Sequence, residues 1–442
     1  KVYMSGASAL RNVIGGLFTQ HCEADLDVYY SGVGVFGGSN FTNAGDAHRV
    51  YTCTMKATSP ILGGKKVALF KSDIGGSGQG VFPVYFGGAQ SATRSFLNLT
   101  AGTCGTRQAS VPNYTCTTEQ NQIPTAGVSD VEPAMFRGLN TPTDDPNYPQ
   151  DGLSEDQLSA LSVVPLFQTV FGVAVNKGLR DAMQAKQGLT VGSDAEADRP
   201  SISYVEAASY FSGLLGDPSS GLGWQPIVGA ADPLKDSRVN VCRRVQGSGT
   251  QASANAFLNT YPCNASAGAI ADSSYSDGGL TNAVASVGPT GNLFVFEGSS
   301  TGNVISCLGE AEKAGKKSYA IGHVSKENNE AGSLWRHVKL DGVAPNRDNV
   351  KSGKYGYFFE STMQWHTEHV STLSADQQAF VAEFAAEAGK PGSLAKLAAA
   401  TQNGVAALPN SYAGAFGTGS ADEIAFGSRM TRGGNSCAVP FV

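Results

Sequence analysis

The chain has 442 residues, of which 15% are charged and 55 are glycine, and its formal net charge is −6. Because single hydrophobic cores stop growing at about 250–300 residues, we expect two domains. The low charge and the high glycine content predict a folded, loop-rich protein and exclude a disordered one. The negative net charge, without a basic stripe, argues against a nucleic-acid partner.

The predicted elements of the first part of the chain are short strands separated by turns rich in small residues. A strand over residues 2–8 leads into a helix in which Leu10, Val13, Ile14 and Leu17 stand at helical spacing. The features that follow are a hairpin region on a sheet edge at 21–70, a strand at 66–71, a second glycine-rich turn at 72–80, a surface excursion at 88–125, a strand end at 127–131 and a loop at 140–152.

In the second part of the chain, strands and helices alternate. The nearly continuous apolar run at 163–176 is typical of buried strands. After it we predict a helix at 202–214, a strand at 239–242, a helix from about 250, a strand at 293–296, a helix at 302–314, a strand at 318–323 and a helix at 374–389 that Ser374 caps. Such alternation is the pattern of an α/β sheet.

Eight cysteines, even in number and widely spaced, contain no Cys-x-x-Cys pair. This pattern favours disulfides in an oxidising compartment over a zinc or redox centre, and eight free thiols in a cytosolic protein are the alternative. From closeness along the chain we predict the pairs Cys22–Cys53 and Cys104–Cys116. The four that remain, whose pairing the sequence leaves open, are Cys242, Cys263, Cys307 and Cys437.

Segments that direct a protein to a membrane are not evident. No run of 18 apolar residues occurs, so we predict no membrane-spanning helix. The strand-like start, together with the cysteines, leads us to expect a secreted protein, periplasmic or extracellular, whose signal peptide has been removed. Four Asn-x-Ser/Thr sequons, at Asn40, Asn98, Asn113 and Asn264, are interpreted as chance matches in a chain rich in serine and threonine.

The strongest motif is Gly-Ser-Gly-Thr at residues 247–250, directly after Arg243 and Arg244 and at the start of a predicted helix. Unpaired N–H groups at a helix N-terminus and the positive end of its dipole attract anions. An arginine adds a fork that binds two oxygens of one anion. No lysine follows the glycines, so the motif is not a nucleotide P-loop. An ordinary turn capped by Ser248 or Thr250 is the alternative.

This motif resembles the Arg-x-Asp-Gly-Ser-Gly-Thr signature of the periplasmic phosphate-binding proteins of ABC transporters, in the type II periplasmic binding protein superfamily. Other segments resemble that family in the same order, over roughly three quarters of the chain. They are the turn Ser-Gly-Ala-Ser at 5–8, the Ser-Gly turn within 74–80, Val-Ser-Asp at 128–130, the run 165–176, the segment 204–213 with Trp224, and Ala-Ile-Gly-His at 320–323.

The resemblance implies an α/β fold with two domains and a ligand cleft between them. Domain I would comprise residues 1–168 and 324–442, with insertions at about 21–70 and 88–125, and domain II residues 169–323. Crossovers near 168 and 324 would let the domains close on the ligand by a hinge motion. All four turns would lie beyond the carboxyl ends of strands, where open α/β sheets bind ligands.

The resemblance also implies a ligand and a site. The ligand would be phosphate or a similar oxyanion, a membrane ABC permease would be the partner, and we expect no cofactor. Asp130 would accept a hydrogen bond from a protonated ligand oxygen, which favours hydrogen phosphate over sulfate. Gln246 stands where the family has aspartate, which leaves the identity of the anion open. The implied ligand-binding residues are Ser8, Ala9, Ser77, Asp130, Arg244, Ser248, Gly249 and Thr250.

Three alternatives are weighed beside this interpretation. The glycine-rich excursions suit an extracellular structural, adhesive or filament-forming protein on the same fold, with self-association. Gly-Ser-Ser-Thr-Gly at 298–302 matches the nucleophile-elbow pattern of a serine hydrolase or phosphatase that would use Ser300. His366 and His369 stand at a spacing that suits a metal pair, but no third ligand has a recognisable spacing, so we expect no metal. Because the Gly-x-Ser-x-Gly pattern arises easily in a chain rich in glycine and serine, we expect no enzyme.

Overall fold

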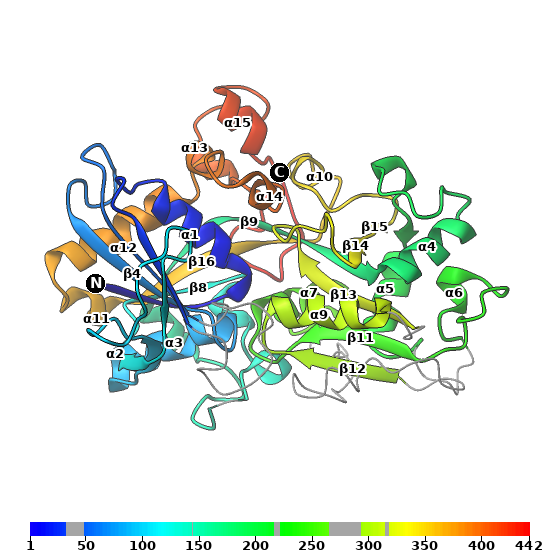
Figure 1. Cartoon of the computed structure of the whole chain (residues 1–442), viewed down its shortest axis with the longest axis horizontal. Helices are drawn as coiled ribbons and strands as arrows, with labels where there is room; N and C mark the ends of the chain where they lie inside the picture. The colour runs from blue at the N-terminus through cyan, green and yellow to red at the C-terminus, as the bar shows by residue number, and fades with distance from the viewer. Residues whose placement is uncertain (32–47, 144, 216–221, 265–292, 314–317) are drawn as a thin grey trace.

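The computed structural model describes residues 1–31, 48–143, 145–215, 222–264, 293–313 and 318–442, in which the chain forms two lobes side by side (Figure 1). Within these residues thirteen strands form one mixed sheet that runs through both lobes, and helices cover it. The predicted α/β class with two lobes is therefore confirmed. The main path of the sheet is β12 (Leu293–Gly298), β11 (Val239–Arg244), β13 (Tyr319–Ser325), β9 (Leu161–Asn176), β16 (Phe358–His366), β8 (Ala126–Ser129), β1 (Val2–Gly6), β4 (Lys66–Ser72), β3 (His48–Thr54), β2 (Asp27–Ser31) and β6 (Tyr114–Cys116).

The first lobe is built on the parallel strands β8, β1 and β4. Val2 and Met4 on β1 pack into a core with the helices α1 (Arg11–Thr19) and α12 (Ala375–Ala388), because side chains alternate between the faces of a strand. Strands β3 and β2 pair antiparallel beyond β4, as the hairpin region at the sheet edge predicts. Sequon residue Asn40 lies outside the described residues. A second, two-stranded sheet joins β5 (Arg94–Leu97) and β7 (Glu119–Gln122).

The apolar run at 163–176 forms one strand, β9, that belongs to both lobes. Up to Val170 it pairs with β16, and from Phe171 it pairs with β13. The short strands β14 (Trp335–His337) and β17 (Val405–Ala406) also pair with it. After β13 the chain returns to the first lobe less directly than β9 leaves it, because β15 (Lys339–Leu340) still pairs with β10 (Ser201–Ile202). The domain limits at 168 and 324 stay predictions.

The second lobe is built on β12, β11 and β13, which are parallel to one another. Each of two helices starts directly beyond one of these strands. Helix α7 (Gly249–Asn259) follows β11 and is capped by the Ser248 hydroxyl, and α9 (Thr301–Glu312) follows β12 and is capped by Ser300. The predicted start near 250 is therefore confirmed. The other helices of this lobe are α4 (Lys177–Lys186), α5 (Tyr204–Phe211) and α6 (Gln225–Val228).

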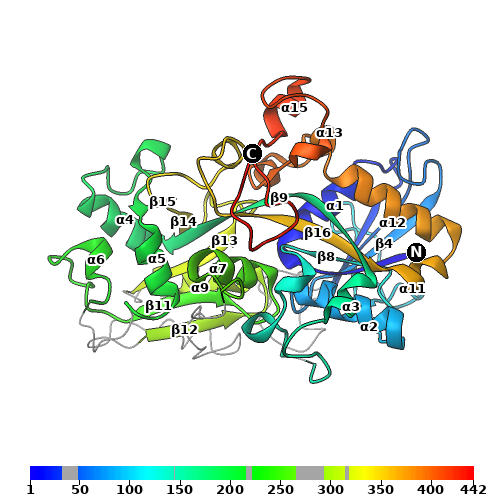
Figure 2. The same cartoon turned by 180° about the vertical axis from the view of Figure 1, so that it is seen from behind.

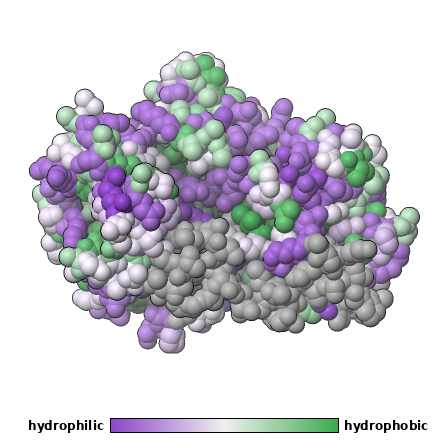
Figure 3. Space-filling view, viewed as in Figure 1, coloured by the Kyte–Doolittle hydropathy of each residue, from purple (hydrophilic) through white to green (hydrophobic). Residues whose placement is uncertain are grey.

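The remaining helices surround these two sheet regions, and the C-terminal segment runs back between the lobes (Figure 2). On the face seen in Figure 3, hydrophilic residues cover much of both lobes and hydrophobic residues form small, separate patches. No helix of the described residues is long and apolar enough to cross a membrane. The remaining helices are α2 (Phe82–Gln90), α3 (Glu155–Ser159), α10 (Arg347–Lys351), α11 (Thr367–Ser371), α13 (Pro391–Leu394), α14 (Ala399–Gln402) and α15 (Ala421–Phe426).

All eight cysteines form disulfides. The predicted pairs Cys22–Cys53 and Cys104–Cys116 are confirmed. Cys242 pairs with Cys307 and so joins β11 to α9 inside the second lobe. The last disulfide, Cys263–Cys437, connects residues 174 positions apart in the chain.

Candidate functional site

Four turns meet between the lobes, each at the carboxyl end of a strand. Because β1, β4 and β8 are parallel, Ser8, Ser77 and Asp130, which follow them, lie at one edge of the sheet. The turn at 247–250 follows β11 and faces this edge from the second lobe. All eight candidate residues named from the sequence are buried. The expected arrangement of turns around one volume is therefore present.

Asp130 contacts the second lobe directly at this site. The Thr250 hydroxyl donates to Asp130 Oδ2 over 3.0 Å, and the Asp130 N–H donates to Ser77 Oγ over 3.2 Å. Gly249 is packed so tightly here that a Cβ would lie 2.8 Å from both Asp130 Cβ and Ser77 Cβ. Only glycine allows such an approach of the helix start. Ser77 is therefore the hydroxyl of the second turn that lies at Asp130.

Arg244 reaches across the lobes in the same volume. Its Nη1 donates to Ser8 Oγ over 3.0 Å and to Thr301 Oγ1 over 3.3 Å. Its Nε and Nη2 donate to the carbonyls of Gly298 (3.1 Å) and Ser299 (2.9 Å). The guanidinium is therefore oriented by the turn that follows β12, a set of residues that the sequence analysis did not include in the site.

The remaining candidate residues have supporting positions. Ala9 lies beside Ser8 in a buried turn, and Ser248 accepts a hydrogen bond from the Gln251 N–H as the helix cap. Next to them the backbones of the two lobes bond directly, since Gly78 N–H donates to the Gly247 carbonyl over 2.7 Å. Gly247 N–H in turn donates to the Asn140 carbonyl over 3.0 Å. These bonds hold the start of α7 against the first lobe.

The Asp130 carboxyl is the electrostatic centre of the site. Burial raises its pKa to about 6, although Thr250, Arg244 and Ser77 each act to lower it. Its second oxygen, Oδ1, is buried and has no hydrogen-bond partner in the described residues. A buried carboxylate oxygen without a donor is costly. Asp130 is therefore suited to accept a hydrogen bond from a group that enters the site.

A buried ion pair connects two of the turns that form the site. Lys71 Nζ bonds Asp73 Oδ1 and donates to the Gly6 carbonyl over 2.6 Å, so it connects the turns after β1 and β4. Burial lowers the pKa of Lys71, and Asp73 opposes this effect. Sequence reasoning missed Lys71 because a lysine at a strand end is usually exposed. Its position between two candidate turns is the signal that was available.

The hydrolase alternative is contradicted by the contacts of Ser300. Its hydroxyl donates to Asn303 Oδ1 over 2.7 Å and accepts from the Asn303 N–H over 3.2 Å. A nucleophilic serine needs a histidine within hydrogen-bond reach, and in the described residues none bonds Ser300. Ser300 is thus a helix cap, and its turn serves to orient Arg244.

The histidine pair considered for a metal has a structural role. His366 caps α11 by accepting from the His369 N–H over 3.4 Å. In the described ranges no group of three His, Cys, Asp or Glu side chains is arranged to hold a metal ion.

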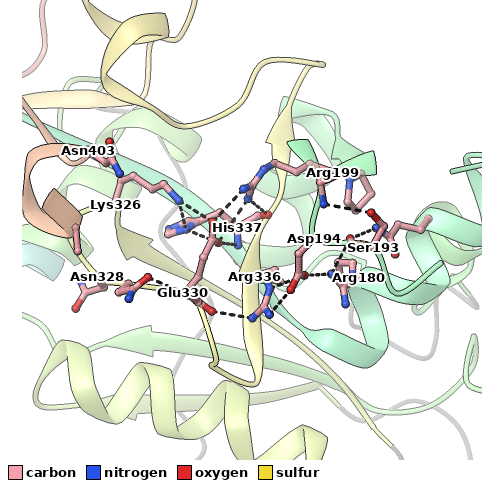
Figure 4. Close-up of a pocket in the computed structure, with 16 residues that line it drawn as sticks. Arg180, Ser193, Asp194, Arg199, Lys326, Asn328, Glu330, Arg336, His337 and Asn403 are labelled. Carbon is pink, nitrogen blue, oxygen red and sulfur yellow. Dashed lines mark hydrogen bonds and ion pairs between the residues drawn. The ribbon is translucent and has the colours of Figure 1, made fainter. Parts of the chain in front are cut away.

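A separate cavity of about 290 Å³ lies in the second lobe next to α14 and contains a cluster of charged residues (Figure 4). At its centre, Glu330 bonds Arg199 Nη2 (3.0 Å), Lys326 Nζ (2.7 Å) and His337 Nδ1 (3.1 Å). Although burial opposes it, these three partners hold the pKa of Glu330 well below its usual range. We refer to Arg180, Asp194, Arg199, Lys326, Glu330, Arg336 and His337 as the Glu330 cluster.

Comparisons with known proteins give remote structural matches. No protein-family model and no curated protein sequence matches the chain. Similar solved structures include a protein from Clostridium perfringens assigned as a phosphate ABC transporter substrate-binding protein, with bound phosphate (12% identity, 89% of this chain and 96% of that chain covered, TM-score 0.44). Others are an ABC-type phosphate transport receptor from Vibrio cholerae (12%, 59% and 74%, 0.32) and the ancestral soluble variant of the human phosphate binding protein (15%, 60% and 71%, 0.34).

Proposed function

We propose that this protein binds a small tetrahedral oxyanion, phosphate by first choice, between its lobes. One observation carries the proposal: the buried Asp130 carboxyl has one unpartnered oxygen and lies between the start of α7 and the Arg244 guanidinium. Arg244, the hydroxyls of Ser8, Ser77 and Thr250, and the N-terminal N–H groups of α7 are donors for an oxyanion. Ala9, Ser248 and Gly249 would contribute backbone or capping contacts.

Asp130 would select among oxyanions by proton count. A carboxylate accepts a hydrogen bond from a P–OH group but repels an oxyanion that has no proton. Hydrogen phosphate would therefore bind at neutral pH and sulfate would not. Because the pKa of Asp130 is raised to about 6, sulfate binding should appear only below that pH, where the protonated carboxyl donates instead.

The setting of this function would be outside the cytoplasm. The eight cysteines are all paired, which is typical of proteins from oxidising compartments. We propose a secreted solute-binding protein that hands its anion to a membrane ABC permease. The anion would be enclosed between the lobes, which the two crossovers connect.

The proposal is tested by the melting temperature with and without millimolar phosphate, because a ligand that binds only the folded state stabilises it. We expect a rise for the wild type and none for Arg244→Ala. Arg243→Lys is the matched control, since the neighbouring Arg243 forms an ion pair with Glu297 and keeps its charge in this variant. No rise with phosphate, sulfate or a related oxyanion would contradict anion binding.

A structural or adhesive role is the second candidate. The direct bond between Gly78 and Gly247 favours it, because polypeptide from the two lobes is in contact where an anion would enter. Such a protein would self-associate at micromolar concentration and show no phosphate-dependent rise in melting temperature. Size-exclusion chromatography beside the melting experiment separates the two candidates.

A further inference from the structure

The C-terminal segment is fixed to the strand that lies at the centre of the molecule. Arg432 is buried, and its Nε donates to the Phe358 carbonyl over 2.9 Å. The backbone N–H groups of Arg432 and Gly434 donate to the two oxygens of Glu360 on β16, over 2.6 and 2.7 Å. The segment that carries Cys437 is therefore held in place, as its path between the lobes in Figure 2 also indicates.

Cys437 itself lies against the segment that follows Asp130. Its neighbour Ser436 donates its N–H to Glu132 Oε1 over 2.8 Å, and Ser436 Oγ accepts from the Glu132 N–H over 3.4 Å. Glu132 is two residues beyond the candidate anion-binding carboxylate. The Cys437 half of the disulfide is thus attached to the first-lobe side of the site.

Cys263, the other half, follows the C-terminal end of α7, whose start faces Asp130. Close to it, the Tyr261 hydroxyl accepts from the Leu139 N–H over 2.9 Å and donates to the Arg137 carbonyl over 3.1 Å. At the other end of the helix, Thr250 bonds Asp130. Helix α7 is therefore connected to the first lobe at both ends, and at one end the connection is covalent.

Opening of the lobes would have to separate α7 from Asp130. The hydrogen bonds break and re-form readily, because hinge motions occur in about microseconds to milliseconds. A disulfide does not break on that timescale. Cys263–Cys437 therefore limits how far the end of α7 can move, whereas each of the other three disulfides joins residues within one lobe.

We propose that the Cys263–Cys437 disulfide holds α7 closed over the anion site, so that the oxidised protein retains its anion and exchanges it slowly. This inference rests on the proposed function for its ligand. The anion would then be a long-lived constituent of the fold.

The test measures exchange of bound radiolabelled phosphate for unlabelled phosphate. The double variant Cys263→Ser/Cys437→Ser should release label at least about tenfold faster than the wild type, equivalent to about 1.4 kcal/mol in the barrier. The matched control is Cys104→Ser/Cys116→Ser, which removes a disulfide within the first lobe and should release label at the wild-type rate. Equal rates in all three proteins would overturn the proposal.

Two further measurements keep the two proposals separable. If no protein shows a phosphate-dependent rise in melting temperature, phosphate binding fails, and hydrogen exchange of the α7 amides then decides about the disulfide: it should be faster in Cys263→Ser/Cys437→Ser than in the control. If the double variant does not fold, small-angle scattering of the oxidised wild type decides. Its curves with and without phosphate should superimpose, and an expansion without phosphate would overturn the proposal.

Discussion

The Asp130 site and the Glu330 cluster each place charged groups of opposite sign around a carboxylate, but the two carboxylates differ in what surrounds them. Glu330 accepts from two cationic side chains and a histidine, and its pKa is held well below its usual range. Asp130 accepts from a hydroxyl, has an oxygen without a partner and has its pKa raised to about 6. The saturated cluster contributes to stability, whereas the unsaturated site is the one at which we propose a ligand.

The two carboxyl groups also change the free energy of unfolding in opposite directions as the pH changes. A lowered pKa means that Glu330 stabilises the folded state above its unfolded-state pKa of about 4.5, and this stabilisation is lost as the pH falls below that value. A raised pKa means the reverse for Asp130. Its burial lowers the free energy of unfolding as the pH rises from 3.8 to about 6. Glu330→Gln and Asp130→Asn test these opposite contributions.

Glu330→Gln should have the largest effect. It leaves Arg199 and Lys326, whose side chains are 15% and 14% exposed, without their carboxylate, and removal of one partner of a largely buried ion pair costs up to about 3–5 kcal/mol. Urea unfolding at neutral pH measures the loss. The phosphate-dependent rise in melting temperature should persist in this variant. Its disappearance would contradict the view that the Glu330 cluster acts independently of the Asp130 site.

Asp130→Asn should act in the opposite direction. At about pH 8 the free energy of unfolding should increase by up to roughly 3 kcal/mol, because about two pKa units of unfavourable ionisation are removed. The increase should vanish below about pH 4, where Asp130 of the wild type is protonated as well. Titration calorimetry should show weaker phosphate binding and new sulfate binding. A destabilised variant would show that Asp130 serves the fold.

Gly249→Ala tests how tightly the lobes close at the site. A Cβ there would lie 2.8 Å from Asp130 Cβ, so we expect the phosphate affinity to fall by at least about tenfold, or 1.4 kcal/mol. Gly309→Ala, in α9, is the control, because its nearest neighbour would be Leu334 at 3.9 Å. That variant should bind phosphate normally and gain up to about 1 kcal/mol from helix propensity. Equal affinities for both variants would contradict the close approach of Gly249.

Ser300→Ala and Thr301→Val should have the smallest effects, and they separate the roles of two neighbouring residues in the turn after β12. Loss of the Ser300 cap should cost about 1 kcal/mol of stability and leave phosphate binding unchanged. Loss of the Thr301 hydroxyl should instead weaken phosphate binding several-fold, because Thr301 orients Arg244. The two variants are compared by melting temperature with and without phosphate. If Ser300→Ala were the variant that bound more weakly, the assigned roles would be wrong.

Local chemistry explains what the sequence could predict. Serine and glycine after a strand, and a capped helix start, are properties of a few neighbouring residues, so the turns at Ser8, Ser77, Asp130 and 247–250 were predictable. The long apolar run at 163–176 likewise indicated the buried strand β9. Nearness in the chain sufficed for the disulfides Cys22–Cys53 and Cys104–Cys116.

Long-range pairing explains what the sequence could not predict. Thr301 reaches Arg244 because β11 and β12 pair in a register that places Gly298 beside Arg244, and no local pattern encodes that register. The role of Lys71 depends on two turns that only the parallel sheet brings together. The disulfide Cys263–Cys437 joins residues 174 positions apart. The local sequence around either cysteine does not indicate which cysteine is its partner.

Strand β9 has a consequence for how the protein is made. In the described residues every strand that pairs with it comes later in the chain: Ile321 pairs with Val175, Phe358 with Val170, and Val405 with Thr169. A chain synthesised from its amino end therefore exposes this apolar strand until the residues beyond 318 have emerged. Folding dominated by such distant pairings is slow and exposed to aggregation. Neither lobe can complete its sheet early, so chaperone protection during synthesis should matter most in this interval.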